Sequence, residues 1–97
     1  MIFKSMIITI NNIMENVSLT QAGNVLYDKM NECVLTEDKL VMDMSGVSSI
    51  PSIFLNMSFG QFIDKYGVEK LKNMVSFTNI TRTQAERITD YLKRYKS

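Results

Sequence analysis

The residues best suited to chemistry follow the segments of the chain that have the composition of strands. Asp43, Ser45 and Gly46 come directly after an apolar run, while Asn11 and Asn79 follow two other apolar runs. In an open parallel sheet, ligands and partners meet the carboxyl ends of the strands, where loops lead into helix N-termini. Unpaired amides at those N-termini favour negatively charged groups, so this rim could bind an anion or a phosphoserine. The polar residues of the rim are Asn11, Asn12, Asp43, Ser45, Gly46, Ser48, Ser49, Ser52, Asn79 and Thr81.

The same residue types also have a purely structural use, because they form turns and cap helices. Asp43 is the only acidic residue at a strand end and could act as a general base. However, the chain has no histidine, and its sequence places no second carboxylate or lysine to work with Asp43. An aspartate in such a position commonly accepts hydrogen bonds from turn amides instead. Since Cys33 is also the only cysteine, we expect no metal site and no cofactor, and we predict that the protein is not an enzyme.

Three apolar or β-branched segments predict strands near residues 6–10, 40–44 and 74–79. A helical pattern follows each of them, and two of these patterns begin with the spacing of a capping box, at Ser18–Gln21 and Thr81–Gln84. The third helix is expected over residues 51–66, since Pro51 suits a first turn and Gly67 ends a helix. Strands that alternate with helices predict an α/β fold with a small, mainly parallel sheet of three to four strands and three helices.

The expected helix over residues 51–66 has more apolar side chains than one buried stripe can hold. Its large apolar residues are Ile53, Phe54, Leu55, Met57, Phe59, Phe62, Ile63 and Tyr66. A helix that packs on one side of a sheet buries a stripe of roughly 100° or more. We therefore expect part of this apolar surface, including Met57 and Phe59, to be exposed for a partner.

Length, charge and cysteine usage limit the classes of protein further. The 97 residues, of which 45% are hydrophobic, suffice for a single domain that spans residues 1–97. A formal net charge of +1 argues against a general attraction to nucleic acid or to an anionic membrane. Residues 6–10 are too few to span a bilayer, and no signal peptide pattern is visible. We therefore expect a cytoplasmic protein.

The region after the second predicted strand resembles a known family. Residues 40–50 are similar to the strand and turn of STAS domains, the fold of bacterial anti-sigma factor antagonists. The wider pattern resembles the STAS-like domains of unknown function more closely, over about residues 18–95. It consists of Asp43, Gly46, Val47, Ile50, Phe54, Leu55, Phe59, Gly60, Tyr66 and Gly67. The resemblance implies the same fold and a role in binding another protein.

The resemblance also bears on regulation by phosphorylation. In the antagonists, an aspartate-serine-serine-glycine run opens the second helix, and a kinase phosphorylates its second serine. Aligned from Asp43 and Gly46, this chain has Ser52 at the first serine and Ile53 at the phosphorylated position. We therefore predict no phosphorylation at the usual position, with Ser52 as the possible substitute.

Two functions remain open from the sequence. The first is a non-catalytic STAS-like regulatory or signalling domain that binds a protein through helix 51–66 and the strand-end loops. Its partner could be a kinase-like ATPase, another signalling protein or a second copy of the chain. The alternative is a sensor that binds a small ligand or nucleotide at the polar rim. The excess of Phe and Met favours a protein partner. The candidate binding residues are Asp43, Ser45, Gly46, Ser49, Ser52, Met57 and Phe59.

Overall fold

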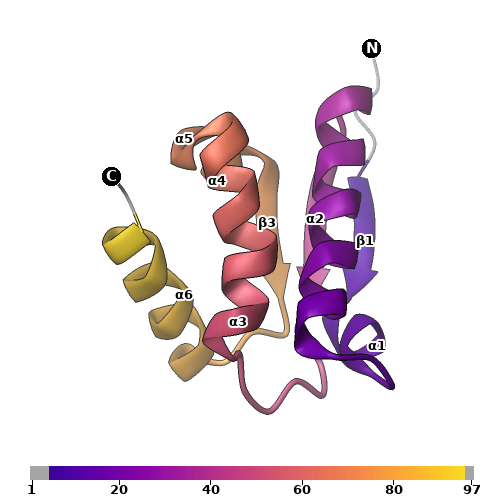
Figure 1. Ribbon diagram of the computed structural model, residues 1–97, viewed down its shortest axis with the longest axis vertical. Coiled ribbons are helices and arrows are strands. Elements are labelled where there is room, and N and C mark those ends of the chain that lie inside the picture. The colour runs from indigo at the N-terminus through magenta and orange to yellow at the C-terminus, as the bar shows by residue number, and fades with distance from the viewer. Residues whose placement is uncertain (1–4, 96–97) are drawn as a thin grey trace.

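Three parallel strands form one sheet in the order β1-β2-β3 in the computed structural model, which describes residues 5–95 (Figure 1). The strands are β1 (Ser5–Thr9), β2 (Lys39–Asp43) and β3 (Val75–Thr78). Each lies within about a residue of its predicted position, and the parallel sheet of an α/β fold is confirmed. β2 is central, and its Met42 is level with Ile8 of β1 and Phe77 of β3. All three strands therefore end at the same edge.

The helices are more numerous than the three that the sequence predicted. In chain order they are α1 (Ile10–Met14), α2 (Leu19–Thr36), α3 (Ser52–Leu55), the π-helical turn η1 (Asn56–Gly60), α4 (Gln61–Tyr66), α5 (Val68–Met74) and α6 (Arg82–Tyr95). The two short helices α1 and α5 lack the length and the capping signals that mark a helix in a sequence. The expected helix over residues 51–66 exists as α3, η1 and α4 in succession, and Gly67 ends it with φ of 91°.

Both predicted capping boxes are present. The Ser18 hydroxyl accepts a hydrogen bond from the amide of Gln21 at 3.1 Å, and the Gln21 side chain accepts one from the amide of Ser18. The same reciprocal pair joins Thr81 and Gln84 at the start of α6. These bonds satisfy amides that a helix leaves free in its first turn, which is why both helices begin where they do.

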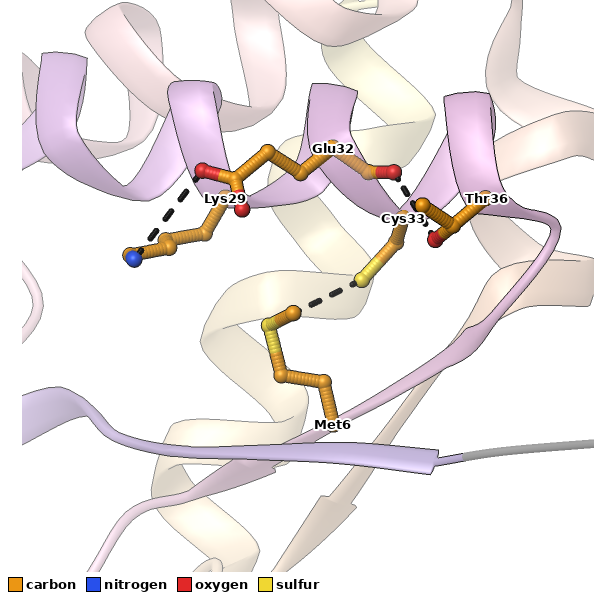
Figure 2. A network of polar contacts seen from close by, with 5 residues as sticks. All are labelled: Met6, Lys29, Glu32, Cys33 and Thr36. Atoms are coloured by element: carbon orange, nitrogen blue, oxygen red, sulfur yellow. Dashed lines mark hydrogen bonds and ion pairs between the residues drawn. The ribbon is translucent and has the colours of Figure 1, made fainter.

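Helices α2, α3 and α4 cover one face of the sheet (Figure 1). Figure 2 shows part of this contact, where the Cys33 thiol of α2 lies 4.0 Å from the thioether sulfur of Met6 in β1. Burial raises the pKa of this thiol, and Asp38 and Glu32 add to the effect. Cys33 is thus a small apolar core residue. The other face of the sheet exposes Ile7 and Ser76, although most parallel sheets are covered on both faces.

The π-helical turn has a local chemical cause. A turn with one extra residue removes carbonyl oxygens from the regular hydrogen-bond pattern of the helix. The Ser58 hydroxyl donates to the carbonyl oxygen of Phe54 at 2.7 Å, and the side-chain amide of Gln61 donates to that of Met57 at 2.6 Å. The same Gln61 amide donates to Asn24 of α2 at 2.7 Å. These bonds satisfy two of the carbonyl oxygens and fix the segment against α2.

The apolar surplus of residues 51–66 has a different explanation from the one that we expected. The segment lies between α2 on one side and α6 on the other, so several directions around it are covered. Gly23 of α2 comes so close that an added Cβ would lie 2.5 Å from the Cβ of Met57. On the opposite side, an added Cβ at Gly60 would lie 2.9 Å from the hydroxyl oxygen of Tyr91. Two flanking helices therefore bury most of the side chains that one sheet could not.

No helix within residues 5–95 is both long enough and apolar enough to cross a membrane.

Candidate functional site

A hydrogen-bonded cluster around Asp43 joins the ends of β2 and β3. One carboxylate oxygen of Asp43 accepts from the side-chain amide of Asn79 at 3.0 Å, from the backbone amide of Ser45 at 3.0 Å and from the Ser45 hydroxyl at 2.7 Å. The Asn79 amide contributes most to holding the pKa of Asp43 below its usual range, and the Ser45 donors add to it. Asn79 has φ of 55°, a left-handed conformation that asparagine tolerates. This arrangement is the turn-forming use of an aspartate.

Gly46 occupies a position that no other residue would fit well. Its φ is 79°, and an added Cβ would lie 3.0 Å from the side-chain nitrogen of Asn11. Asn11 therefore reaches the turn after β2 from helix α1, which follows β1 directly. The rim residues of all three strand ends are thus brought together, as the parallel topology predicted.

Helix α6 fixes the loop that runs from residue 44 to residue 51. The side-chain amide of Gln84 donates to the carbonyl oxygen of Val47 at 2.7 Å, and this bond is buried. One turn further along α6, the Arg87 guanidinium donates to the carbonyl oxygen of Ile50 at 3.1 Å and to the Ser52 hydroxyl at 2.9 Å. The side chains of Val47 and Ile50 are buried beneath the loop. The loop is therefore held in one conformation, although it has no regular secondary structure.

The outer surface of this loop combines hydroxyl groups with one large apolar side chain. Ile53, in the first turn of α3, is 45% exposed. The side chains of Ser48, Ser49 and Ser52 are also exposed, as is Asn56 one turn further along. We call the surface formed by residues 45–53 the loop surface. An exposed isoleucine with hydroxyl groups around it, on a fixed backbone, has the composition of a small protein-binding patch.

The predicted site residues fall into three groups. Asp43, Ser45 and Gly46 form the turn, and Ser49 and Ser52 lie on the loop surface. Met57 is half-buried against Gly23 of α2. Phe59 is only 2% exposed, and its ring lies near that of Phe77, with centroids 6.4 Å apart. Phe59 thus belongs to the core and not to the exposed surface that we expected, because it lies against Phe77 of β3 on the covered face of the sheet.

Sequence reasoning missed the residues that shape the loop surface. Gln84 was identified as part of a capping box, and that role hid its second bond to Val47. Nothing in the sequence pattern marked Arg87, although its guanidinium faces the loop. Both residues are about 37 positions from the carbonyl groups that they bind, so no local pattern could reveal the contacts. Ile53 was named among the apolar residues of helix 51–66 and as the residue at the phosphorylation position, but not among the candidate binding residues.

The small α/β fold, with three parallel strands in one sheet, agrees with the family that the sequence resembles. The model of the family described as the STAS-like domain of unknown function (DUF4325) matches residues 22–94. The chain therefore belongs to this family, and the resemblance seen in the sequence is confirmed. No curated protein and no solved structure is significantly similar to the chain.

Proposed function

We propose that this protein is a non-catalytic regulatory domain of the cytoplasm that binds a protein partner through the loop surface, with Ile53 at the centre of the contact. A kinase-like ATPase or another signalling protein is the kind of partner that the resemblance to anti-sigma factor antagonists suggests. The observation that carries the proposal is the 45% exposure of Ile53 on a loop that Gln84 and Arg87 hold in place. A fixed surface loses little conformational freedom when it binds, and this favours affinity.

The chemistry of the rim supports a binding role over a catalytic one. The carboxylate of Asp43 already accepts three hydrogen bonds at one oxygen, and the Ser52 hydroxyl, at the start of α3, accepts one from Arg87. A lowered pKa also makes Asp43 a weaker base at neutral pH. The same internal bonds leave fewer polar groups for a small ligand, so a ligand sensor at this rim has less support than a protein-binding surface.

Replacement of Ile53 by aspartate tests the proposal. Burying a whole isoleucine side chain contributes about 1.5–3 kcal/mol, and about half of this one remains available to a partner. Because the variant also places a charge in the contact, we expect I53D to weaken binding at least tenfold. Stability should fall by about 1 kcal/mol or less, because the variant loses the buried half of the isoleucine side chain while an acidic residue in the first turn of a helix offsets part of that loss.

The matched control is Leu35→Asp, which changes an apolar residue that is 74% exposed near the end of α2. The immobilised wild-type chain and both variants are each incubated with a lysate of the source organism, and bound proteins are quantified by mass spectrometry. We expect one or a few proteins that wild type and L35D retain and that I53D loses. If every specifically retained protein binds I53D as well as it binds wild type, the loop surface is not the binding site.

A further inference from the structure

We infer that a second binding site lies beside β3, where an extended acidic peptide segment of a partner protein could add a strand to the sheet. This site is distinct from the loop surface, so the inference goes beyond the proposed function. It rests on a free strand edge, an apolar groove next to that edge, and lysine side chains at the rim of the groove.

The direction of the free edge follows from one hydrogen bond. The carbonyl oxygen of Thr78 accepts from the amide of Met44 at 2.9 Å, so the backbone polar groups of Thr78 point toward β2. Backbone groups alternate in direction along a strand, so those of Ser76 also point toward β2 and those of Phe77 point away from it. β3 is the last strand of the sheet within residues 5–95. The amide and carbonyl groups of Phe77 are therefore available to another strand.

An apolar groove of about 610 Å³ lies along this edge. It is lined by Phe77 of β3, Ile80 of the following loop, Val68 of α5, and Ala85, Ile88 and Leu92 of α6. A smaller recess of about 170 Å³ shares Phe77, Ile88 and Leu92 with the groove and reaches Phe59 and Leu71. The groove can accept side chains from one face of an added strand, and the recess can hold one large apolar side chain.

The groove is open because α6 packs against α3 and η1 and not against the edge of β3. The residues of α6 that bind other elements lie on one face of the helix, where Arg87 contacts Ser52 and Tyr91 donates to Asn56 at 2.8 Å. These contacts place α6 beside α3 and η1, on the side of the molecule away from β1 (Figure 1). The adjacent face of α6, with Ile88 and Leu92, borders the groove. Thus α6 fixes the loop surface with one face and forms a wall of the second site with another.

The charges at the rim indicate the chemistry of the segment. Lys72 of α5 and Lys93 of α6 line the groove, and both side chains are exposed. The ion pairs found within residues 5–95 involve neither of them. Glu69 is the acidic residue of the rim, so the lysines leave a net positive charge. An extended segment with apolar residues at alternate positions and acidic residues between them complements both the floor and the rim. Main-chain hydrogen bonds supply affinity in this mode of recognition, and side-chain pockets supply specificity.

The first test uses a defined probe, a nine-residue acetylated and amidated peptide in which isoleucine alternates with glutamate. We expect saturable binding to the ¹⁵N-labelled protein, with the amide signal of Phe77 among those that shift. Two further probes carry N-methyl groups, one on all isoleucines and the other on all glutamates. Alternate amides point in opposite directions along a strand, so each methylated probe can pair with β3 in only one of the two orientations open to the parent peptide, and at least one of the two should bind more weakly than the parent. Binding of both as tightly as the parent would show that no strand pairing occurs.

Variants of the rim test the location and the charge. Thr89 borders the groove and Thr83 does not, and both are exposed on α6. We expect T89E to weaken probe binding at least fivefold, T83E to leave it unchanged, and K72E combined with K93E to weaken it at least tenfold. The I53D variant should bind the probe as wild type does, which separates this site from the proposed function.

Three results would overturn the inference. They are the absence of probe binding at millimolar concentration, binding of a fatty acid such as decanoate in place of the peptide, and burial of the Phe77 amide in a dimer of the chain.

Discussion

The packing of α2 against the segment from α3 to α4 requires a close approach at Gly23, and Gly23→Ala tests how far the stability of the fold depends on it. An added Cβ at Gly23 would lie 2.5 Å from the Cβ of Met57 and 3.0 Å from the carbonyl oxygen of Phe54. Both atoms are fixed to the backbone of the neighbouring helix, so neither can move away without a shift of the helix. Overpacking of this kind costs about 1–3 kcal/mol.

The opposing effect is smaller. Alanine in place of glycine within a helix gains about 0.5–1 kcal/mol. Since an added Cβ would lie only 2.5 Å from the Cβ of Met57, the cost should fall in the upper part of its range, and we expect G23A to lower the free energy of unfolding by about 1–2.5 kcal/mol in total. For a domain of this size, that loss lowers the melting temperature by about 4–20 °C. Urea and thermal denaturation followed by circular dichroism measure both quantities.

Gly60→Ala is the matched control, because Gly60 is buried in a helical segment as well. There the nearest atoms to an added Cβ are the ends of two side chains, Tyr91 at 2.9 Å and Tyr95 at 3.3 Å. Side-chain ends can shift, so G60A should be less destabilising than G23A. A G23A protein as stable as wild type, or a G60A protein that is the less stable of the two, would refute the argument from close approach.

Three other predictions concern the groups that hold the loop and α6 in place. Replacing Gln84 by alanine removes the bond to the buried carbonyl of Val47 and the cap at Thr81, so denaturation should show a loss of about 1–3 kcal/mol. Q84E keeps the acceptor for the cap but sets a buried carboxylate, which cannot donate, against the carbonyl oxygen of Val47, so it should lose at least as much as Q84A. The pKa of Asp43 is lower in the folded protein, so the stabilising effect of its carboxylate is present above about pH 4 and is lost as the pH falls through the lowered pKa. The free energy of unfolding should therefore fall less steeply below pH 4 in D43N than in wild type. An unchanged slope would contradict this. Burial, with smaller effects of Tyr95 and Asp64, raises the pKa of Tyr91 to about 12. The contribution of the neutral Tyr91 side chain to stability is therefore lost as the pH rises from about 10 through 12. Ultraviolet titration of wild type and Y91F should assign the late ionisation to this residue.

The sequence predicted those features whose causes are local. β-Branched runs marked the three strands, and the spacing of Ser18–Gln21 and Thr81–Gln84 marked the starts of α2 and α6. The parallel topology then followed from the alternation of strands and helices. The turn-forming role of Asp43 was also one of the two interpretations that the sequence allowed.

The sequence did not predict features that depend on contacts between distant residues. Phe59 is buried beside Phe77 of β3, and α6 covers the neighbouring side of η1 through Tyr91 and Asn56, 35 positions apart. The fixed conformation of the loop likewise results from Gln84 and Arg87. The glycine at position 23 was a signal that could have been used, since an isolated glycine within a helix often indicates close packing. Such a contact would have shown that α2 covers the helix around Met57.

The most direct test of the proposed function is a map of the surface that a bound partner covers. With a partner identified through the I53D and L35D comparison, the ¹⁵N- and ¹³C-methyl-labelled chain is titrated and its spectra are recorded. We predict that the methyl signal of Ile53 and the amide signals of residues 45–50 and of Ser52 shift first and most, while the methyl signals of Ile7 and Leu35 stay in place. If the largest shifts fall on the exposed face of the sheet or on α2, and Ile53 does not respond, the loop surface is not where this domain binds its partner.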